Sequence, residues 1–63
     1  MNLEKPTFSK QEIFNYLKGF DPKTIRQTIN NTITEKRNVS IDYAKKQKTL
    51  RKSEVLIILS EFE

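Results

Sequence analysis

Two complete helix-start signals lie in the first third of this 63-residue chain and constrain its fold more than any other feature. In the first, Ser9 is followed three residues later by Glu12. This is a capping box, in which two backbone N–H groups of the first helical turn find side-chain partners. Gly19, the single glycine of the chain, stands where a left-handed residue ends many helices. The pattern predicts a helix over residues 10–18, with Gly19 as the left-handed terminator.

The second signal begins a longer helix. Asp21 is a good N-cap and the proline after it is a good first helical residue, so a helix is predicted over Pro22–Glu35. Ile25, Ile29 and Ile33 recur every four residues and form one buried stripe. The short connection between the two helices suits a helix-turn-helix, and an ordinary αα-hairpin has the same spacing.

Positive charge is concentrated after this second helix. Residues 36–52 hold seven basic residues and one acid, a local charge of +6, whereas the rest of the chain holds five basic and seven acidic residues. The two parts together give the net charge of +4. A short segment of one sign creates a local positive potential that attracts polyanions.

The basic segment also alternates in polarity. Val39, Ile41 and Tyr43 lie on one side of an extended chain, which predicts a strand over Val39–Tyr43 with Tyr43 in the core. A loose turn over Ala44–Gln47 and a second strand over Lys48–Leu50 complete a basic hairpin. A basic hairpin after a helix pair is typical of the wing of a small DNA-binding domain.

The C-terminal segment predicts a third helix from Lys52. Its apolar face consists of Val55, Ile58, Leu59 and Phe62. A buried strand over the same apolar run is the alternative, although the Ser53–Glu54 pair favours a helix. The predicted fold class is α+β: a small winged helix-turn-helix of two helices, a two-stranded antiparallel hairpin as wing and a short third helix. This domain spans residues 8–63 after a flexible arm of residues 1–7, and no internal repeat is expected.

Composition argues against an enzyme. The chain has no cysteine and no histidine, so it lacks thiolate metal sites, the usual zinc ligands and the commonest general base. It shows no glycine-rich phosphate loop and no paired carboxylates. We therefore expect no catalytic residue, no metal, no cofactor and no small-molecule substrate. No signal peptide and no apolar run long enough for a bilayer are visible, so we expect a cytoplasmic protein without a membrane partner.

The exposed face of the helix over Pro22–Glu35 carries the candidate binding residues. It is rich in Asn, Gln and Thr. An ordinary solvent-exposed helix face consists mainly of the strong helix formers Glu, Lys, Arg and Ala, and Asn and Thr are poor ones. Amide side chains can pair with adenine, and arginine with guanine. The alternative is that these residues have no function and reflect the amino-acid composition of an AT-biased genome. Together with the hairpin cations, the predicted DNA-contacting residues are Lys23, Thr24, Arg26, Gln27, Asn30, Asn31, Thr34, Arg37, Lys45, Lys46, Lys48 and Arg51.

The order of these segments resembles a known family. Residues 8–17 (Phe-Ser-Lys-Gln-Glu-Ile-Phe-Asn-Tyr-Leu) look like the first helix, and residues 21–29 (Asp-Pro-Lys-Thr-Ile-Arg-Gln-Thr-Ile) like the recognition helix, of the small excisionases of phages and conjugative transposons. These are winged-helix relatives of the MerR DNA-binding domain. Residues 48–59 (Lys-Thr-Leu-Arg-Lys-Ser-Glu-Val-Leu-Ile-Ile-Leu) look like the strand and helix after the wing. The wing tip departs from the family because it has no glycine.

This resemblance implies a function. It implies a non-enzymatic factor that binds repeated sites on double-stranded DNA, bends it and directs an integrase or recombinase toward excision. Self-association on DNA or contact with the integrase is expected to use an apolar patch at Leu56 and Ile57. By position, Lys23, Thr24, Arg26, Gln27 and Asn30 would enter the major groove, and the hairpin lysines would contact phosphates or the minor groove. The alternative is a small phage-type protein that binds and inhibits a host protein, with the basic hairpin against an acidic surface.

Overall fold

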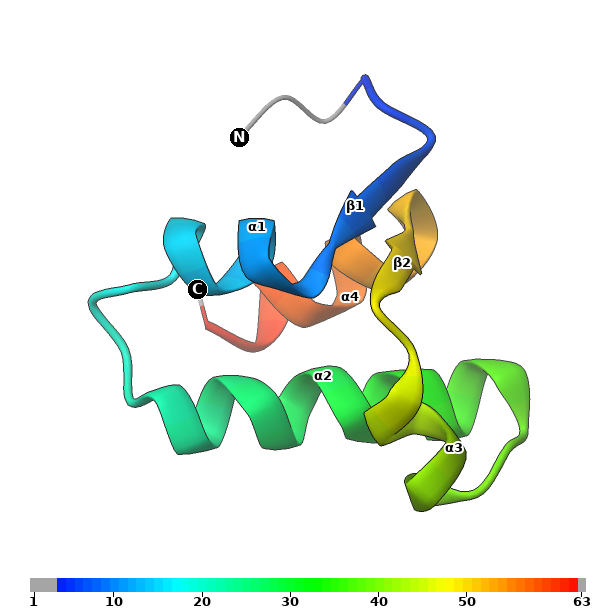
Figure 1. Cartoon of the computed structure of the whole chain (residues 1–63). Helices are drawn as coiled ribbons and strands as arrows, with labels where there is room; N and C mark the ends of the chain where they lie inside the picture. The colour runs from blue at the N-terminus through cyan, green and yellow to red at the C-terminus, as the bar shows by residue number, and fades with distance from the viewer. Residues whose placement is uncertain (1–3, 63) are drawn as a thin grey trace.

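Four helices and one two-stranded antiparallel sheet make up residues 4–62, the part of the chain that this computed structural model describes (Figure 1). A strand comes first, three helices follow it, and a second strand precedes the last helix. They are β1 (Thr7–Ser9), α1 (Lys10–Tyr16), α2 (Pro22–Arg37), α3 (Ile41–Lys46), β2 (Thr49–Arg51) and α4 (Lys52–Glu61). Within the described residues, no helix is long and apolar enough to cross a bilayer.

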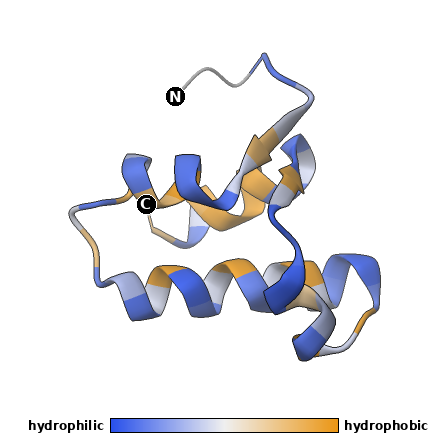
Figure 2. Cartoon of the chain, viewed as in Figure 1, coloured by the Kyte–Doolittle hydropathy of each residue, from blue (hydrophilic) through white to orange (hydrophobic). Residues whose placement is uncertain are grey.

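Helix α2 lies along one side of the domain, and the other three helices contact it (Figure 1). Asp21 caps its start by accepting a hydrogen bond from the Thr24 backbone N–H at 3.3 Å. The predicted stripe of isoleucines is confirmed, because Ile25, Ile29 and Ile33 are all buried. Figure 2 shows this apolar stripe turned toward the rest of the domain. The helix runs slightly past its predicted end, to Arg37.

Helix α1 begins as predicted and ends differently. Ser9 Oγ accepts from the Glu12 backbone N–H at 3.1 Å, and Glu12 Oε1 accepts from the Ser9 N–H at 3.2 Å, so the capping box is confirmed. The left-handed conformation predicted at Gly19 is wrong. A turn closed by the Phe20 N–H and the Leu17 carbonyl ends α1 instead. The left-handed residue of the described chain is Asn38, at the end of α2.

The predicted strand over Val39–Tyr43 is wrong, because residues 41–46 form helix α3. Ser40 caps this helix by accepting from the Tyr43 backbone N–H at 3.2 Å. Asp42 in the first turn and lysines in the last turn complement the helix dipole. Tyr43 was expected in the core and is 50% exposed, whereas the buried residue of α3 is Ala44. Helix-end chemistry therefore outweighs a short alternation in this segment.

The predicted wing is absent as a consequence. Strand β2 overlaps the expected second strand, but it pairs with β1, and Phe8 faces Leu50 at the centre of the sheet. The sheet thus joins the beginning of the domain to its C-terminal part. Thr7, assigned to a flexible arm, belongs to β1, while residues 1–3 of that arm lie outside the described chain. The helix predicted from Lys52 is confirmed as α4, and the alternative strand over the same run is wrong.

The sheet also reveals an internal repeat, contrary to expectation. Residues 7–17 read Thr-Phe-Ser-Lys-Gln-Glu-Ile-Phe-Asn-Tyr-Leu, and residues 49–59 read Thr-Leu-Arg-Lys-Ser-Glu-Val-Leu-Ile-Ile-Leu. Each forms a short strand that runs directly into a helix. The two residues at the strand–helix junctions, Ser9 and Arg51, share φ −85° and ψ 156°. Antiparallel pairing about the Phe8–Leu50 pair relates the two units by an approximate two-fold axis.

The hydrophobic core lies between these two units and α2. Equivalent positions of the repeat are buried together: Phe8 with Leu50, Ile13 with Val55, and Leu17 with Leu59. The isoleucine stripe of α2 and Ala44 of α3 complete the core. This packing leaves the opposite face of α2 and one side of α3 exposed.

Candidate nucleic-acid interface

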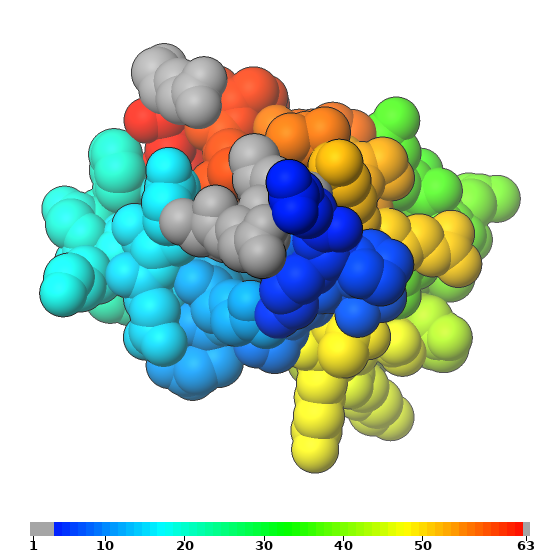
Figure 3. Space-filling model, turned by 90° about the horizontal axis from the view of Figure 1, so that it is seen from above, coloured from blue at the N-terminus to red at the C-terminus, as the bar shows by residue number. Residues whose placement is uncertain are grey.

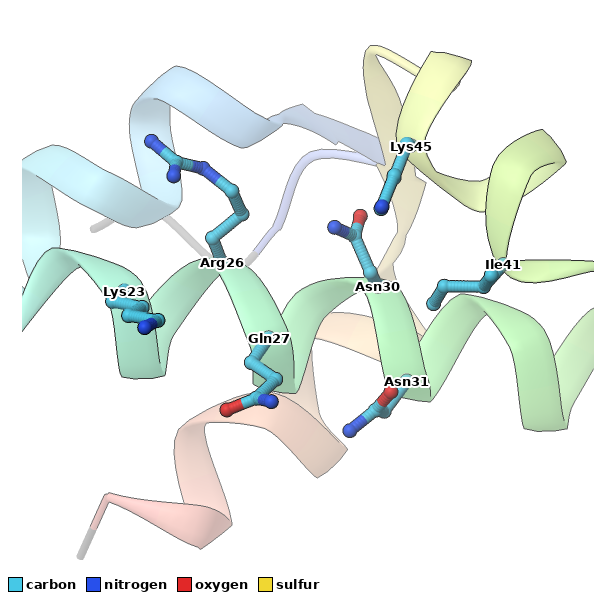
Figure 4. Close-up of a pocket in the computed structure, with 7 residues that line it drawn as sticks. All are labelled: Lys23, Arg26, Gln27, Asn30, Asn31, Ile41 and Lys45. Atoms are coloured by element: carbon cyan, nitrogen blue, oxygen red, sulfur yellow. The ribbon is translucent and has the colours of Figure 1, made fainter.

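A groove of about 330 Å³ lies between α2 and α3 (Figure 4). Helix α3 borders it because the left-handed turn at Asn38 folds the chain back beside α2, where Ala44 is buried. None of the described residues that line the groove is acidic. They are Lys23, Arg26, Gln27, Asn30 and Asn31 of α2 with Ile41 and Lys45 of α3.

The groove brings together half of the residues predicted to contact DNA. Five come from α2, and Lys45 comes from a segment that was expected to be a hairpin loop. Ile41 was missed, because the alternating pattern placed it inside a strand. It is 40% exposed and supplies the apolar part of the groove wall. A helix assignment for residues 41–46, based on the Ser40 cap, would have found it.

The three cations of the groove differ in their contacts with neighbouring side chains. The Arg26 guanidinium lies 5.9 Å from the centre of the Phe14 ring, and Figure 4 shows it turned toward α1. This cation–π contact fixes Arg26 at one end of the groove. Lys23 and Lys45 are exposed and form no ion pair with the described residues. Their ammonium groups are therefore available to an anion that enters the groove.

Asn30 forms the floor of the groove and is 4% exposed. Lys10, at the start of α1, donates from Nζ to Asn30 Oδ1 at 2.9 Å. The same ammonium donates to the Ala44 carbonyl at 2.8 Å and to the Lys45 carbonyl at 3.5 Å. Burial lowers the pKa of Lys10, and the nearby Arg37 charge lowers it further. Lys10 thus ties α1 both to the middle of α2 and to the last turn of α3.

Arg37 was predicted to contact DNA, and the structure places it in an ion pair with Glu54 of α4. Its Nε and Nη2 atoms each lie 2.8 Å from a carboxylate oxygen of Glu54, and its side chain is 17% exposed. The hydrogen bonds that Arg37 donates to the Glu54 carboxylate raise the pKa of Arg37. Nη2 also donates to the Thr49 carbonyl at 3.3 Å. Arg37 therefore fixes the end of α2 to β2 and α4, outside the groove.

Glu54 is 2% exposed, and its negatively charged carboxylate accepts hydrogen bonds from the Arg37 guanidinium and from the Arg51 backbone N–H. Burial by itself raises the pKa of this carboxyl. The hydrogen bonds from Arg37 and from the Arg51 backbone N–H outweigh burial, so the pKa of Glu54 lies below its usual value. A carboxylate that accepts a paired arginine fork is held in one geometry. This ion pair is the strongest polar connection of α4 to α2 among the described residues.

The remaining predicted site residues lie outside the groove. Thr24 donates its hydroxyl to the Asp21 carboxylate at 3.1 Å and so belongs to the helix cap. The Thr34 hydroxyl is buried without a hydrogen-bond partner among the described residues. The other three are exposed cations, of which Lys46 ends α3, Lys48 precedes β2 and Arg51 is the last residue of β2. Figure 3 shows side chains of the α3–β2 connection projecting from the body of the molecule.

A second hollow lies on the other side of α2 and has the opposite character. It measures about 210 Å³ and is lined by three hydroxyl or amide residues and by the acids Glu35 and Glu61. The face of α2 that lines the α2–α3 groove presents Lys23 and Arg26 instead. An anionic ligand is therefore attracted to the α2–α3 side and repelled from the α4 side.

Comparisons with known proteins find no match among protein-family models, curated proteins or solved structures, so the groove is the basis for proposing a function. The resemblance to excisionases therefore stays a prediction. What the structure describes is a small α+β domain with a donor-rich, acid-free groove between two helices.

Proposed function

We propose that this domain binds double-stranded DNA through the α2–α3 groove, as a small regulator or excisionase-type factor of a mobile element. The observation that carries the proposal is the composition of the groove: three cations, three amides, one apolar side chain and no acid. Lysine and arginine neutralise phosphates, and exposed amides can read base edges. In this proposal the protein is a non-enzymatic cytoplasmic factor.

The binding mode differs from the winged model expected from sequence. In our proposal the α1–α2 pair serves as the helix-turn-helix, and the N-terminal half of α2 faces the DNA. Helix α3 takes over the phosphate-anchoring role of the wing, through Lys45 and Lys46 in its last turn. The acids Glu35 and Glu61 line the second hollow and not the groove, which supports an approach of DNA to the α2–α3 side.

The test is a DNA-binding titration across a salt series with charge-reversed variants. Lys23→Glu combined with Lys45→Glu should weaken binding to all duplexes by at least about tenfold and lower the salt slope by about two. Lys36→Glu is the matched control, because Lys36 is an exposed cation of the same helix outside the groove. Absence of duplex binding by the wild-type protein at low salt would refute the proposal, as would an equal effect of the control.

Sequence preference provides the second half of the test. Gln27 and Asn31 are exposed amides one helical turn apart, at positions that can meet base edges. Replacing either with alanine should leave non-specific affinity unchanged and reduce discrimination at one base pair by about 1–3 kcal/mol. Competition between the selected site and scrambled duplexes measures this difference. A uniform loss on all duplexes would assign these amides to the DNA backbone.

A further inference from the structure

The orientation of the Asn30 amide at the groove floor is determined by its neighbour. Asn30 Oδ1 lies 2.9 Å from Lys10 Nζ. A lysine ammonium is a donor only, so the amide oxygen must face Lys10 and the NH₂ group must be the end that remains for a ligand. In Figure 4 the amide nitrogen of Asn30 lies on the side of the amide that is nearer to Arg26.

At Asn30 the groove therefore presents the NH₂ donor of the amide, whereas the amide oxygens of Gln27 and Asn31 are acceptors elsewhere in the lining. The charged groups around Asn30 are Lys23, Arg26 and Lys45, which are also donors only. Adenine presents a donor and an acceptor side by side, so it needs both halves of an amide. The Asn30 oxygen already accepts from Lys10, so adenine would have to share that oxygen with the ammonium, whereas a phosphate oxygen needs the NH₂ group alone.

We infer that the NH₂ group of Asn30 donates to a phosphate oxygen of the bound DNA strand, and that Lys10 is the positioning residue for this contact. The inference rests on the proposed function. A phosphate oxygen accepts and never donates, which fits a donor-only floor flanked by cations. Base recognition then falls to Gln27 and Asn31 nearer the surface. Guanine, whose O6 and N7 are both acceptors, is the competing ligand and an outcome of the test.

Lys10 contributes although it does not line the groove. Its ammonium orients Asn30 and also holds the carbonyls of Ala44 and Lys45, in the last turn of α3. One partly buried cation therefore sets the direction of the floor donor and the position of the backbone that carries Lys45. Its positive charge also lies beneath the groove, where it adds to the attraction for an anion.

The first experiment uses the wild-type protein. The side-chain NH₂ resonance of Asn30 is followed by ¹⁵N-resolved NMR during titration with a duplex, and with the same duplex carrying a neutral methylphosphonate at one position at a time. One position should abolish the Asn30 shift and weaken binding about tenfold, as expected for loss of a hydrogen bond to a charged group. A shift that survives every backbone substitution and disappears on replacing one guanine would overturn the inference in favour of base reading.

The second experiment tests the coupling with variants. Asn30→Ala should weaken binding about tenfold on every duplex sequence, and the sensitive methylphosphonate should cost it nothing further. Asn31→Ala is the matched control and should stay sensitive to that methylphosphonate. Circular dichroism checks the fold, since Asn30 is buried. An Asn30→Ala variant that is folded and binds like wild type would contradict the inference.

The role of Lys10 is tested by substitution and rescue. Lys10→Met should remove the contribution of Asn30, so that adding Asn30→Ala to it costs no further affinity. Lys10→Arg should restore most of the binding, because a guanidinium can also donate to the Asn30 oxygen. Independent losses from the two positions would exclude positioning through Asn30.

A further titration distinguishes a phosphate group of DNA from free inorganic phosphate as the ligand of Asn30. Inorganic phosphate at millimolar concentration should leave the Asn30 resonance in place, because the proposed contact needs the polymer to align it. A saturable shift with inorganic phosphate and none with DNA would identify a free-anion site and overturn the inference. A wild-type protein that binds no duplex at all fails the proposed function first. Duplex binding that leaves the Asn30 resonance unmoved fails only the inference.

Discussion

The two strand–helix units of the repeat use the same local signal in two different environments. In β1–α1, Glu12 completes the capping box and pairs with Lys5, and both side chains are largely solvated, with 39% and 45% exposed. In β2–α4, Glu54 occupies the equivalent position, accepts from the Arg51 backbone N–H at 2.8 Å and pairs with the mostly buried Arg37. One carboxylate starts a helix, and the other also holds the tertiary structure together.

The difference follows from what each unit packs against. Helix α4 lies against α2, whose last turn supplies Arg37, whereas the start of α1 meets the exposed segment before β1. The caps differ too. Ser9 supplies an acceptor for the Glu12 N–H, while Arg51 has none, so Glu54 provides the side-chain part of its cap alone. Equivalent sequence positions therefore carry very unequal energetic roles.

The largest expected effect tests what the units share. Phe8→Ala and Leu50→Ala each empty one side of the fully buried pair at the centre of the sheet. Each should lower the free energy of unfolding by about 3–5 kcal/mol, because a cavity remains in a small core. Urea unfolding followed by circular dichroism measures both. A severe loss for one and a negligible loss for the other would argue against the two-fold core.

Breaking the buried ion pair should come next. Glu54→Gln leaves the Arg37 guanidinium without its counter-charge in a largely buried position and should cost about 3 kcal/mol. Glu12→Gln is the matched control at the equivalent position and should leave the urea midpoint unchanged, because its pair is exposed. Equal losses from the two variants would contradict the unequal roles described above.

Lowering the pH should gradually remove the stabilisation that the ionised Glu54 carboxylate contributes. Hydrogen bonds from Arg37 and Arg51 place the folded pKa of Glu54 below its ordinary value of 4.5 despite burial. The ionised carboxylate therefore contributes its full stability above pH 4.5 and loses it as the pH falls through the folded pKa. The difference in unfolding free energy between wild type and Glu54→Gln should shrink below pH 4.5. A constant difference down to the lowest accessible pH would count against this assignment.

The smallest effect concerns the caps. Ser9→Ala removes the hydroxyl acceptor for the Glu12 N–H and should cost about 1 kcal/mol. Arg51→Ala keeps the backbone N–H that Glu54 binds and should change stability by less than about 0.5 kcal/mol. Thermal unfolding of the two variants at neutral pH checks this order. The reverse order would show that the arginine side chain, and not Glu54, secures the start of α4.

Local chemistry made part of the fold predictable. The starts of α1 and α2, and the inward stripe of α2, depend on residues within one or two helical turns of each other. The segment after α2 was mispredicted because its short alternation competes with a Ser40 cap, and the cap prevails once Ala44 is buried against α2. Strand β1 was missed because three residues form a strand only with a partner far along the chain.

The candidate site divides in the same way. The amide-rich face of α2 was identified from composition and spacing, and Gln27 and Asn31 are exposed on it. Asn30, expected on the same exposed face, is buried at the groove floor. The roles within that face were not predictable. Lys10 fixes the Asn30 oxygen from a distant helix, and Arg37 is committed to Glu54. Both depend on which groups meet after folding.

The sequence by itself determined where helices begin, which face of α2 is apolar and where positive charge accumulates. These properties arise from neighbours along the chain and from the helical period. Only the tertiary structure decided that Glu54 is buried while Glu12 is solvated, and that α3 lines the groove in place of a wing. Burial and hydrogen-bond partners depend on distant segments, so two nearly identical sequence signals acquired different functions.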